Sequence, residues 1–200
     1  MKIVTKLLLA AAVVACSLQP AAAAVSSAGL GFDILGVYYM PSDSRYQGIG
    51  TGIGLNVKLD DSLTMGYRVE ELSVRAEDIV AAAIIRGNHT VTFQGITAYY
   101  RTVSKDKLNI DFGMWIGAAT SADLDSTAAV VNPVTSPFLE PLGRITYTSS
   151  GKIDTYAVVG VGYRFIRNFN VVSPFGAAAG VADLKNFDGL EINFGVGLGF

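Results

Sequence analysis

Stretches in which apolar and polar residues alternate with a period of two run along most of this chain. The last stretch, residues 188–200, has apolar residues at every second position, with Glu191, Asn193 and glycines between them. A period of two is typical of a β-strand, because successive side chains point to opposite faces. A terminal strand with a free edge would recruit other chains, and closing the sheet into a barrel removes that edge. The pattern therefore predicts a final strand that closes a barrel.

Seven earlier stretches show the same alternation and predict seven further strands. They cover residues 30–40, 48–59, 63–75, 89–103, 107–119, 152–166 and 169–181. Pro174 lies inside the seventh, and because proline cannot donate to the ladder we expect a bulge or irregularity there. The fourth stretch leaves its register open, because two sets of apolar residues compete for the outer face: Val91, Phe93 and Tyr99, or Ile96, Ala98 and Tyr100.

The segments between these stretches alternate between short and long. Those at 60–62, 104–106 and 167–168 are tight turns by their length, whereas 120–151 is the longest interruption and holds three prolines. Residues 76–88 break the alternation and predict a short helix or an apolar loop, while parts of 120–151, such as 145–148, are candidates to extend a hairpin. Bacterial barrels have short periplasmic turns and longer external loops. The chain is therefore predicted to be all-β, an eight-stranded antiparallel transmembrane β-barrel.

The first 24 residues have the pattern of a secretory signal peptide. A basic start with Lys2 and Lys6 precedes a nine-residue apolar core, and alanines at 22–24 form a small-residue cleavage site. The apolar core is too short to span a membrane. We therefore expect a cleaved signal peptide at residues 1–24 and one barrel domain at residues 25–200. The residues before Cys16 also loosely fit a lipoprotein box, so a lipid anchor on Cys16 remains an alternative.

Composition narrows the choice of fold class. Half of the residues are hydrophobic, yet after the leader the longest apolar run is shorter than a spanning helix needs. This leaves a transmembrane barrel or an unusually apolar soluble sandwich or lipocalin-like barrel. The face opposite the apolar one, built from Gly, Asn, Asp, Glu and Arg, favours a narrow lumen over a solvated surface. Without the leader, 13 basic residues face 17 acidic ones, so nothing favours nucleic acid as a partner.

If the apolar faces contact lipid, the charged residues of the opposite face enter the lumen. Both signs of charge are present, as buried charges that need partners require. A packed polar core that plugs the barrel is one alternative. A thin pore along the inward-facing glycines is the other. The predicted lumen network comprises Asp33, Lys58, Arg68, Glu70, Asp111, Asp154, Arg164 and Glu191.

The sequence offers little support for catalysis, and we expect no enzyme, cofactor or metal. His89 is the only histidine and Cys16, in the leader, the only cysteine, so no metal-binding cluster is available. Barrel-type lipid A deacylases carry a His-x-Ser pair, whereas the residue two positions after His89 is Val91. We therefore interpret His89 as a residue of the rim or of a loop.

The C-terminal segment resembles the closing strand of bacterial outer-membrane β-barrels, through Phe194, Val196, Leu198 and Phe200. Across the mature chain the pattern is similar to the small eight-stranded OmpA/OmpX-type barrels. The resemblance implies a monomer in the bacterial outer membrane, surrounded by its lipid and recognised through this strand by the barrel-assembly machinery. It implies a structural or surface-interaction role through external loops, with a narrow channel for small solutes as the alternative and a lipid-modifying enzyme as a less favoured one.

Overall fold

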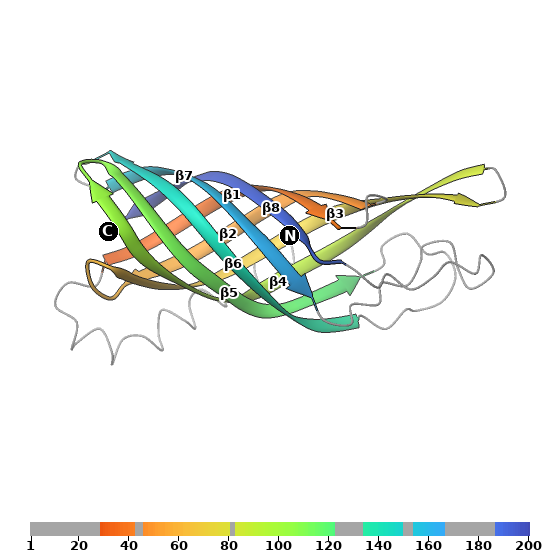
Figure 1. Cartoon of the computed structure of the whole chain (residues 1–200), viewed down its shortest axis with the longest axis horizontal. Helices are drawn as coiled ribbons and strands as arrows, with labels where there is room; N and C mark the ends of the chain where they lie inside the picture. Colours follow the sequence, from red (N-terminus) through yellow and green to blue (C-terminus); the bar gives the residue numbers. More distant parts are fainter. Residues whose placement is uncertain (1–28, 43–45, 81–82, 123–133, 150–153, 167–186) are drawn as a thin grey trace.

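A computed structural model describes residues 29–42, 46–80, 83–122, 134–149, 154–166 and 187–200, and these residues form a closed barrel (Figure 1). The predicted signal peptide lies outside the described residues. Each strand pairs antiparallel with its neighbours in the chain, and β1 also pairs with β8. In chain order the strands are β1 (Gly29–Pro41), β2 (Tyr46–Lys58), β3 (Leu63–Val80), β4 (Ala83–Lys105), β5 (Leu108–Ala122), β6 (Val134–Ser149), β7 (Asp154–Ile166) and β8 (Gly189–Gly199).

The final strand closes the barrel, as the sequence predicts. β8 pairs with β1 from Gly31 opposite Gly199 to Pro41 opposite Gly189. Leu30 and Phe200 exchange both of their backbone hydrogen bonds, with N···O distances of 3.1 and 2.8 Å. The backbone of the last residue is therefore paired, and the edge that a free terminal strand would expose is gone.

The structure settles the register of the fourth predicted strand. Phe93 and Tyr99 are buried inside the barrel, whereas Ile96 and Tyr100 are more than half exposed on its outside. Apolar residues occupy both faces of β4 because the interior is aromatic at this level. A register shift between Arg101 and Val103 adds to the ambiguity of the pattern.

The prediction of a helix or loop at residues 76–88 is wrong. β3 continues to Val80 and β4 begins at Ala83. In the hairpin that they form, the backbone of Glu77 lies opposite that of Arg86 in the strand register. Figure 1 shows this hairpin extending past the other strands at one end of the barrel. The pairing of β3 with β2 stops at Ala76, opposite Tyr46. Beyond Ala76, β3 therefore no longer follows the barrel wall. A strand outside the wall is not required to keep one apolar and one polar face, which explains why the alternation fails here.

The predicted interruption at residues 120–151 also needs correction, because it contains the whole of β6. Pro137 and Pro141 obscured this strand, since proline usually marks a loop or an edge. Both are exposed on the outside, Pro137 lies beyond the last β6–β7 pair, and the pairing of β6 with β7 is interrupted at Pro141. The barrel reaches eight strands through β6. The predicted strand at 169–181 and turn at 167–168 lie outside the described residues, in the connection from β7 to β8.

The connections sort into two ends of the barrel. The connections at 59–62, 106–107 and 150–153 lie at the end that also carries Phe200, which we call the turn end. The other end, the loop end, carries the connections at 42–45, 123–133 and 167–188 and the projecting β3–β4 hairpin. β4 runs through Lys105, so the predicted turn at 104–106 shifts to Asp106 and Lys107. Asp106 has a φ of 53°, a conformation that Asp tolerates better than most residues.

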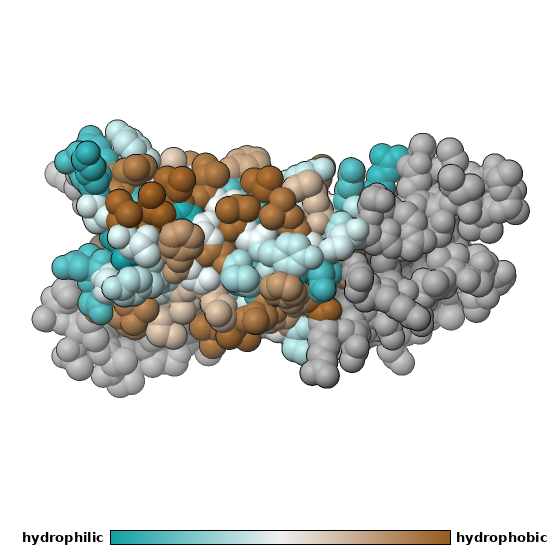
Figure 2. All heavy atoms as spheres, viewed as in Figure 1, coloured by the Kyte–Doolittle hydropathy of each residue, from teal (hydrophilic) through white to brown (hydrophobic). Residues whose placement is uncertain are grey.

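The outer face of the barrel is apolar. Its large exposed side chains belong to all eight strands and include Phe194 and Val196, each 61% exposed, Leu198 and Phe200. Figure 2 shows apolar side chains over the middle of the barrel and hydrophilic ones toward its ends. Among the described residues, no helix is long and apolar enough to cross a membrane. A water-soluble barrel would place these side chains inside, so this apolar belt is the surface that suits contact with lipid.

Candidate functional site in the barrel interior

Two arginines and three glutamates form a buried group inside the barrel, which we call the central ion cluster. Arg164 on β7 donates from Nε to Glu140 Oε2 at 2.6 Å and from Nη2 to Glu70 Oε2 at 2.9 Å. It also pairs with Glu191 on β8. Arg68 on β3 donates to Glu191 Oε1 at 2.7 Å and pairs with Glu70. All five side chains are at most 4% exposed, so each charge depends on its partners in place of water.

The central ion cluster crosses the full width of the barrel. Its members come from β3, β6, β7 and β8, and β3 and β7 are four strands apart in either direction around the closed ring. The bond from Arg164 to Glu70 therefore joins opposite walls. Because eight strands enclose little more than their own side chains, ion pairs that join opposite walls divide the interior into two parts.

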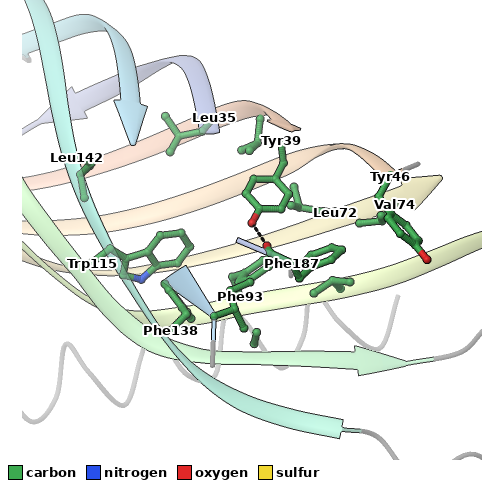
Figure 3. Close-up of a cluster of buried hydrophobic side chains, with 14 of the residues drawn as sticks. Leu35, Tyr39, Tyr46, Leu72, Val74, Phe93, Trp115, Phe138, Leu142 and Phe187 are labelled. Carbon is green, nitrogen blue, oxygen red and sulfur yellow. Dashed lines mark hydrogen bonds between the residues drawn. The ribbon is translucent and has the colours of Figure 1, made fainter. Parts of the chain in front are cut away.

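Aromatic side chains pack against the cluster and form an aromatic layer, whose rings are drawn in Figure 3. Arg164 stacks over Phe93, with Cζ 3.9 Å from the ring centroid, and lies 4.8 Å from that of Trp115. Phe138 meets Phe93 and Trp115 edge-on, at centroid separations of 5.4 and 4.8 Å. Such cation–π and edge-to-face contacts are favourable where water is excluded. These ring contacts hold the guanidinium of Arg164 in place.

Phe187, in the segment that leads into β8, completes the aromatic layer. Its side chain is 2% exposed and packs 5.5 Å from the ring of Tyr39, whose hydroxyl donates to the backbone oxygen of Phe187 (Figure 3). The next residue, Asp188, accepts from the backbone N–H of Ile166 at 2.6 Å, and its own carbonyl accepts from Ser42 at 2.6 Å. A residue outside the strands thus packs into the interior toward the loop end.

A second polar network fills the turn end. Asp111 accepts from Arg101 and from Arg144, both at 3.0 Å, and the Arg144 guanidinium lies 3.7 Å from the ring centroid of Tyr99. On the opposite wall, three residues of β1, β2 and β7 form a group of their own. These are Asp33, Asn56 and Tyr156. Asp33 accepts from Asn56 Nδ2 at 2.7 Å and from the hydroxyl of Tyr156.

Side chains of neighbouring strands occupy the room above several inward-facing glycines. A Cβ added to Gly52 would lie 3.0 Å from Glu70 Cγ, and one added to Gly54 would lie 3.1 Å from Asp33 Oδ2. At Gly197 it would overlap the ring of Tyr156. Each of these glycines pairs across the strands with the residue that covers it. The glycines therefore make room for the polar networks.

Six of the eight predicted lumen residues lie in these networks. Arg68, Glu70, Arg164 and Glu191 belong to the central ion cluster, and Asp33 and Asp111 to the turn-end network. The other two lie outside them. Lys58 is half-exposed and pairs with Asp61 in the β2–β3 turn at 2.8 Å, and Asp154 is exposed at the first position of β7. The alternation assigns both residues to the inner face, but they lie at the turn-end limit of their strands and so stay outside the networks.

The sequence prediction missed Glu140 and Arg144, which bring one acid and one base to the interior. Both lie on β6, in the segment interpreted as an interruption, so the pattern did not assign them to the inner or outer face. An alternation of inward Phe138, Glu140, Leu142 and Arg144 was present and could have found them. His89, expected at a rim or in a loop, is a strand position of β4 opposite Val74. In the described ranges, no group of three or more His, Cys, Asp or Glu is arranged to hold a metal ion.

Solved structures of bacterial outer-membrane proteins have a similar fold. Neisserial surface protein A matches with a TM-score of 0.55 and 12% identity, over 86% of this chain and 95% of that one. The outer membrane protein OprG from Pseudomonas aeruginosa matches with a TM-score of 0.58 and 12% identity, over 87% and 96%. A major outer membrane protein from Thermus thermophilus matches with a TM-score of 0.50 and 12% identity, over 87% and 100%. No protein-family model and no curated protein matches the chain.

Together, the closed barrel, the apolar belt and the polar interior define a class of protein. The chain has the fold of the small eight-stranded β-barrels of bacterial outer membranes. Within that class, the ion pairs that join opposite walls are a distinct feature of the described interior.

Proposed function

We propose that this protein is a sealed barrel of the bacterial outer membrane that acts through the surface of its loop end. The main support is the bond between Arg164 and Glu70, which joins opposite walls at 2.9 Å. A barrel whose cross-section is filled by ion pairs and aromatic rings has no free path for solutes. The parts left to interact with other molecules are the outer wall and the ends.

In this proposal the turn end faces the periplasm and the loop end faces outward. Outer-membrane barrels have short periplasmic turns and longer external loops. Among the described residues, the β3–β4 hairpin, whose strands run to Val80 and from Ala83, then extends furthest from the cell. We propose it as the main interaction element, and we propose that the barrel is a monomer surrounded by outer-membrane lipid. The outward side chains of β8 that end in Phe200 are proposed to be recognised by the barrel-assembly machinery.

Cysteine labelling in intact cells tests this orientation. The only native cysteine, Cys16, lies in the predicted leader, so an introduced cysteine is the single target in the mature chain. Ala83→Cys at the hairpin is expected to react with a membrane-impermeant maleimide on intact cells. Asp106→Cys at the opposite end is the matched control and is expected to react only after the envelope is permeabilised. The reverse result would contradict the orientation, and labelling of both sites would contradict a membrane-spanning barrel.

A narrow channel is the second candidate function. It is favoured by charged and polar side chains that continue through much of the interior, from Asp33 near the turn end to Arg164. Single-channel recording of the refolded protein in a planar bilayer distinguishes the two functions. A sealed barrel is expected to be silent when a gel shift between boiled and unboiled samples shows that it is folded. Discrete, salt-dependent current steps would support the channel instead.

A further inference from the structure

The apolar belt is not uniform, because a groove of about 540 Å³ crosses four strands at the turn end. This volume lies within the range of small-molecule binding sites. Its walls and floor come from β6, β7, β8 and β1, on both sides of the seam between the first and last strands. The lining residues are Phe32, Ile34, Tyr147, Ser149, Thr155, Tyr156, Ala157, Val196, Gly197 and Leu198.

Small residues on β7 create the depth of this groove. Ala157 pairs with Tyr147 on one side and with Val196 on the other, so a methyl group lies between two larger side chains. Thr155 pairs in the same way with Ser149 and Leu198. Two positions further along the outer face of β7 the wall is higher again, with Val159 56% exposed and outside the groove.

Apolar and polar groups are arranged along the groove in a fixed order. Ile34 and Val196 stand toward the middle of the belt, whereas Ser149 and Thr155 stand at the turn end. Among the described residues, the hydroxyls of Tyr147, Ser149 and Thr155 have no side-chain hydrogen-bond partner. In a bilayer this end of the belt meets the polar lipid headgroups, where such hydroxyls can donate to ester or phosphate oxygens.

We propose that the groove binds one phospholipid of the periplasmic leaflet, with an acyl chain along Ala157 and Val196 and the glycerol and phosphate oxygens near Ser149 and Thr155. The inference rests on the proposed membrane location and on the turn end facing the periplasm. Lipid is the occupant that the chemistry favours, because the groove opens through the apolar belt and the hydroxyls of Ser149 and Thr155 lie at its headgroup end. Each belt position contacts lipid, but here the wall is recessed to hold one molecule longer than its neighbours.

Photo-crosslinking in bilayers tests the proposal. The protein is refolded into vesicles of phosphatidylethanolamine and phosphatidylglycerol that contain a trace of phosphatidylethanolamine with a diazirine on its acyl chain. After irradiation, labelled peptides are quantified by mass spectrometry. We expect labelling of peptides containing residues 154–158 and 195–198 to exceed that of other belt peptides at least fivefold. Ala157→Phe, which fills the groove from outside, should remove that excess, whereas the matched variant Val159→Phe should retain it.

Three results would overturn the inference. Labelling spread evenly around the belt, or equal labelling of the two variants, would mean that lipid contacts the groove as it contacts any other surface. In parallel samples treated with a bifunctional amine crosslinker, a covalent dimer that Ala157→Phe abolishes would identify a second copy of the chain as the occupant. A gel shift between boiled and unboiled samples checks folding in the same vesicles. A protein that fails to fold there would contradict the proposed function, whereas a folded protein with even labelling contradicts only the lipid site.

Discussion

The guanidinium of Arg164 on β7 donates to the carboxylate of Glu70 on β3 across the barrel, with an N···O distance of 2.9 Å. Neither side chain is accessible to solvent. Because the two strands are opposite each other in the ring, this bond fixes the distance between walls that share no backbone pairing. Buried charges are costly unless they are paired, so the two walls and the remaining members of the central ion cluster depend on one another.

Replacing Arg164 is expected to destabilise the barrel strongly. Arg164→Met would leave Glu70, Glu140 and Glu191 close together with only Arg68 to balance them. Breaking a buried pair from one side costs about 3–5 kcal/mol. Lys58→Met is the control, because its pair with Asp61 is exposed to solvent and contributes little to stability. Urea unfolding in lipid vesicles measures both, and equal effects would argue against a structural role for the cluster.

The packing around the inward glycines predicts a second pair of variants. At Gly197 an added methyl group would displace the ring of Tyr156 and weaken its hydrogen bond to Asp33. Overpacking of this kind costs about 1–3 kcal/mol. At Gly199, on the same face of the same strand, the methyl group would meet Asp154 Cβ at an ordinary 3.5 Å. Gly197→Ala should therefore lower the free energy of unfolding and Gly199→Ala should leave it within about 0.5 kcal/mol. Two harmless variants would indicate an unfilled lumen.

The two corrections to the predicted fold have different physical causes. Alternation is enforced where a strand separates lipid from the interior, so β1, β2, β5 and the closing strand could be predicted from the sequence. The β3–β4 hairpin extends beyond that region, and nothing there requires one apolar face. β6 does separate lipid from the interior, but two prolines interrupt its pattern, and their tolerance depends on the missing β6–β7 pairs at Pro137 and Pro141.

The interior networks were predictable only in part, because inward positions can be assigned only on strands that the sequence reveals. Parity on the recognised strands gave Arg68, Glu70, Arg164 and Glu191, yet the third glutamate, Glu140, lies on the unrecognised strand. The alternation gives the face of a residue but not its position along the barrel axis. That position separates Lys58 and Asp154 from the networks. Phe187 lies outside the strands, and its position depends on tertiary contacts with Tyr39 that carry no periodic signal.

The turn between β2 and β3 predicts a pH dependence of stability at the turn end. Asp60 Oδ1 accepts from Ser62 Oγ at 2.8 Å and from the backbone N–H groups of Ser62 and Leu63, each at 2.7 Å. These bonds, the Ser62 hydroxyl first, hold the pKa of Asp60 below its ordinary value. A lowered folded-state pKa contributes stability that is present above the unfolded pKa, about 3.9, and is lost as pH falls through the folded value.

Asp60→Asn isolates that contribution. Unfolding of the wild type and the variant is compared from pH 7 down to pH 2.5. The wild type is expected to be the more stable at pH 7, and the difference should shrink as pH falls below about 4. Asp106→Asn is the control, since Asn also tolerates the positive φ found at Asp106 in the β4–β5 turn. A difference between the wild type and Asp60→Asn that stays constant with pH would show that the charge on Asp60 is not responsible.

A charge on the outer wall distinguishes a membrane barrel from a soluble one. Ile96 is 57% exposed on the outside of β4, within the apolar belt, and Ser73 is exposed on β3 nearer the loop end. On a surface in water, replacing either residue with Arg would change stability by less than about 0.5 kcal/mol. In a bilayer the cost depends on depth, at about 2–4 kcal/mol near the midplane and about 0–1 kcal/mol near the interfaces. We therefore expect Ile96→Arg to destabilise the folded protein in vesicles by at least about 1 kcal/mol more than Ser73→Arg. Equal and negligible costs would mean that the apolar belt does not contact lipid, and the membrane location, the sealed-barrel function and the lipid groove would all fail together.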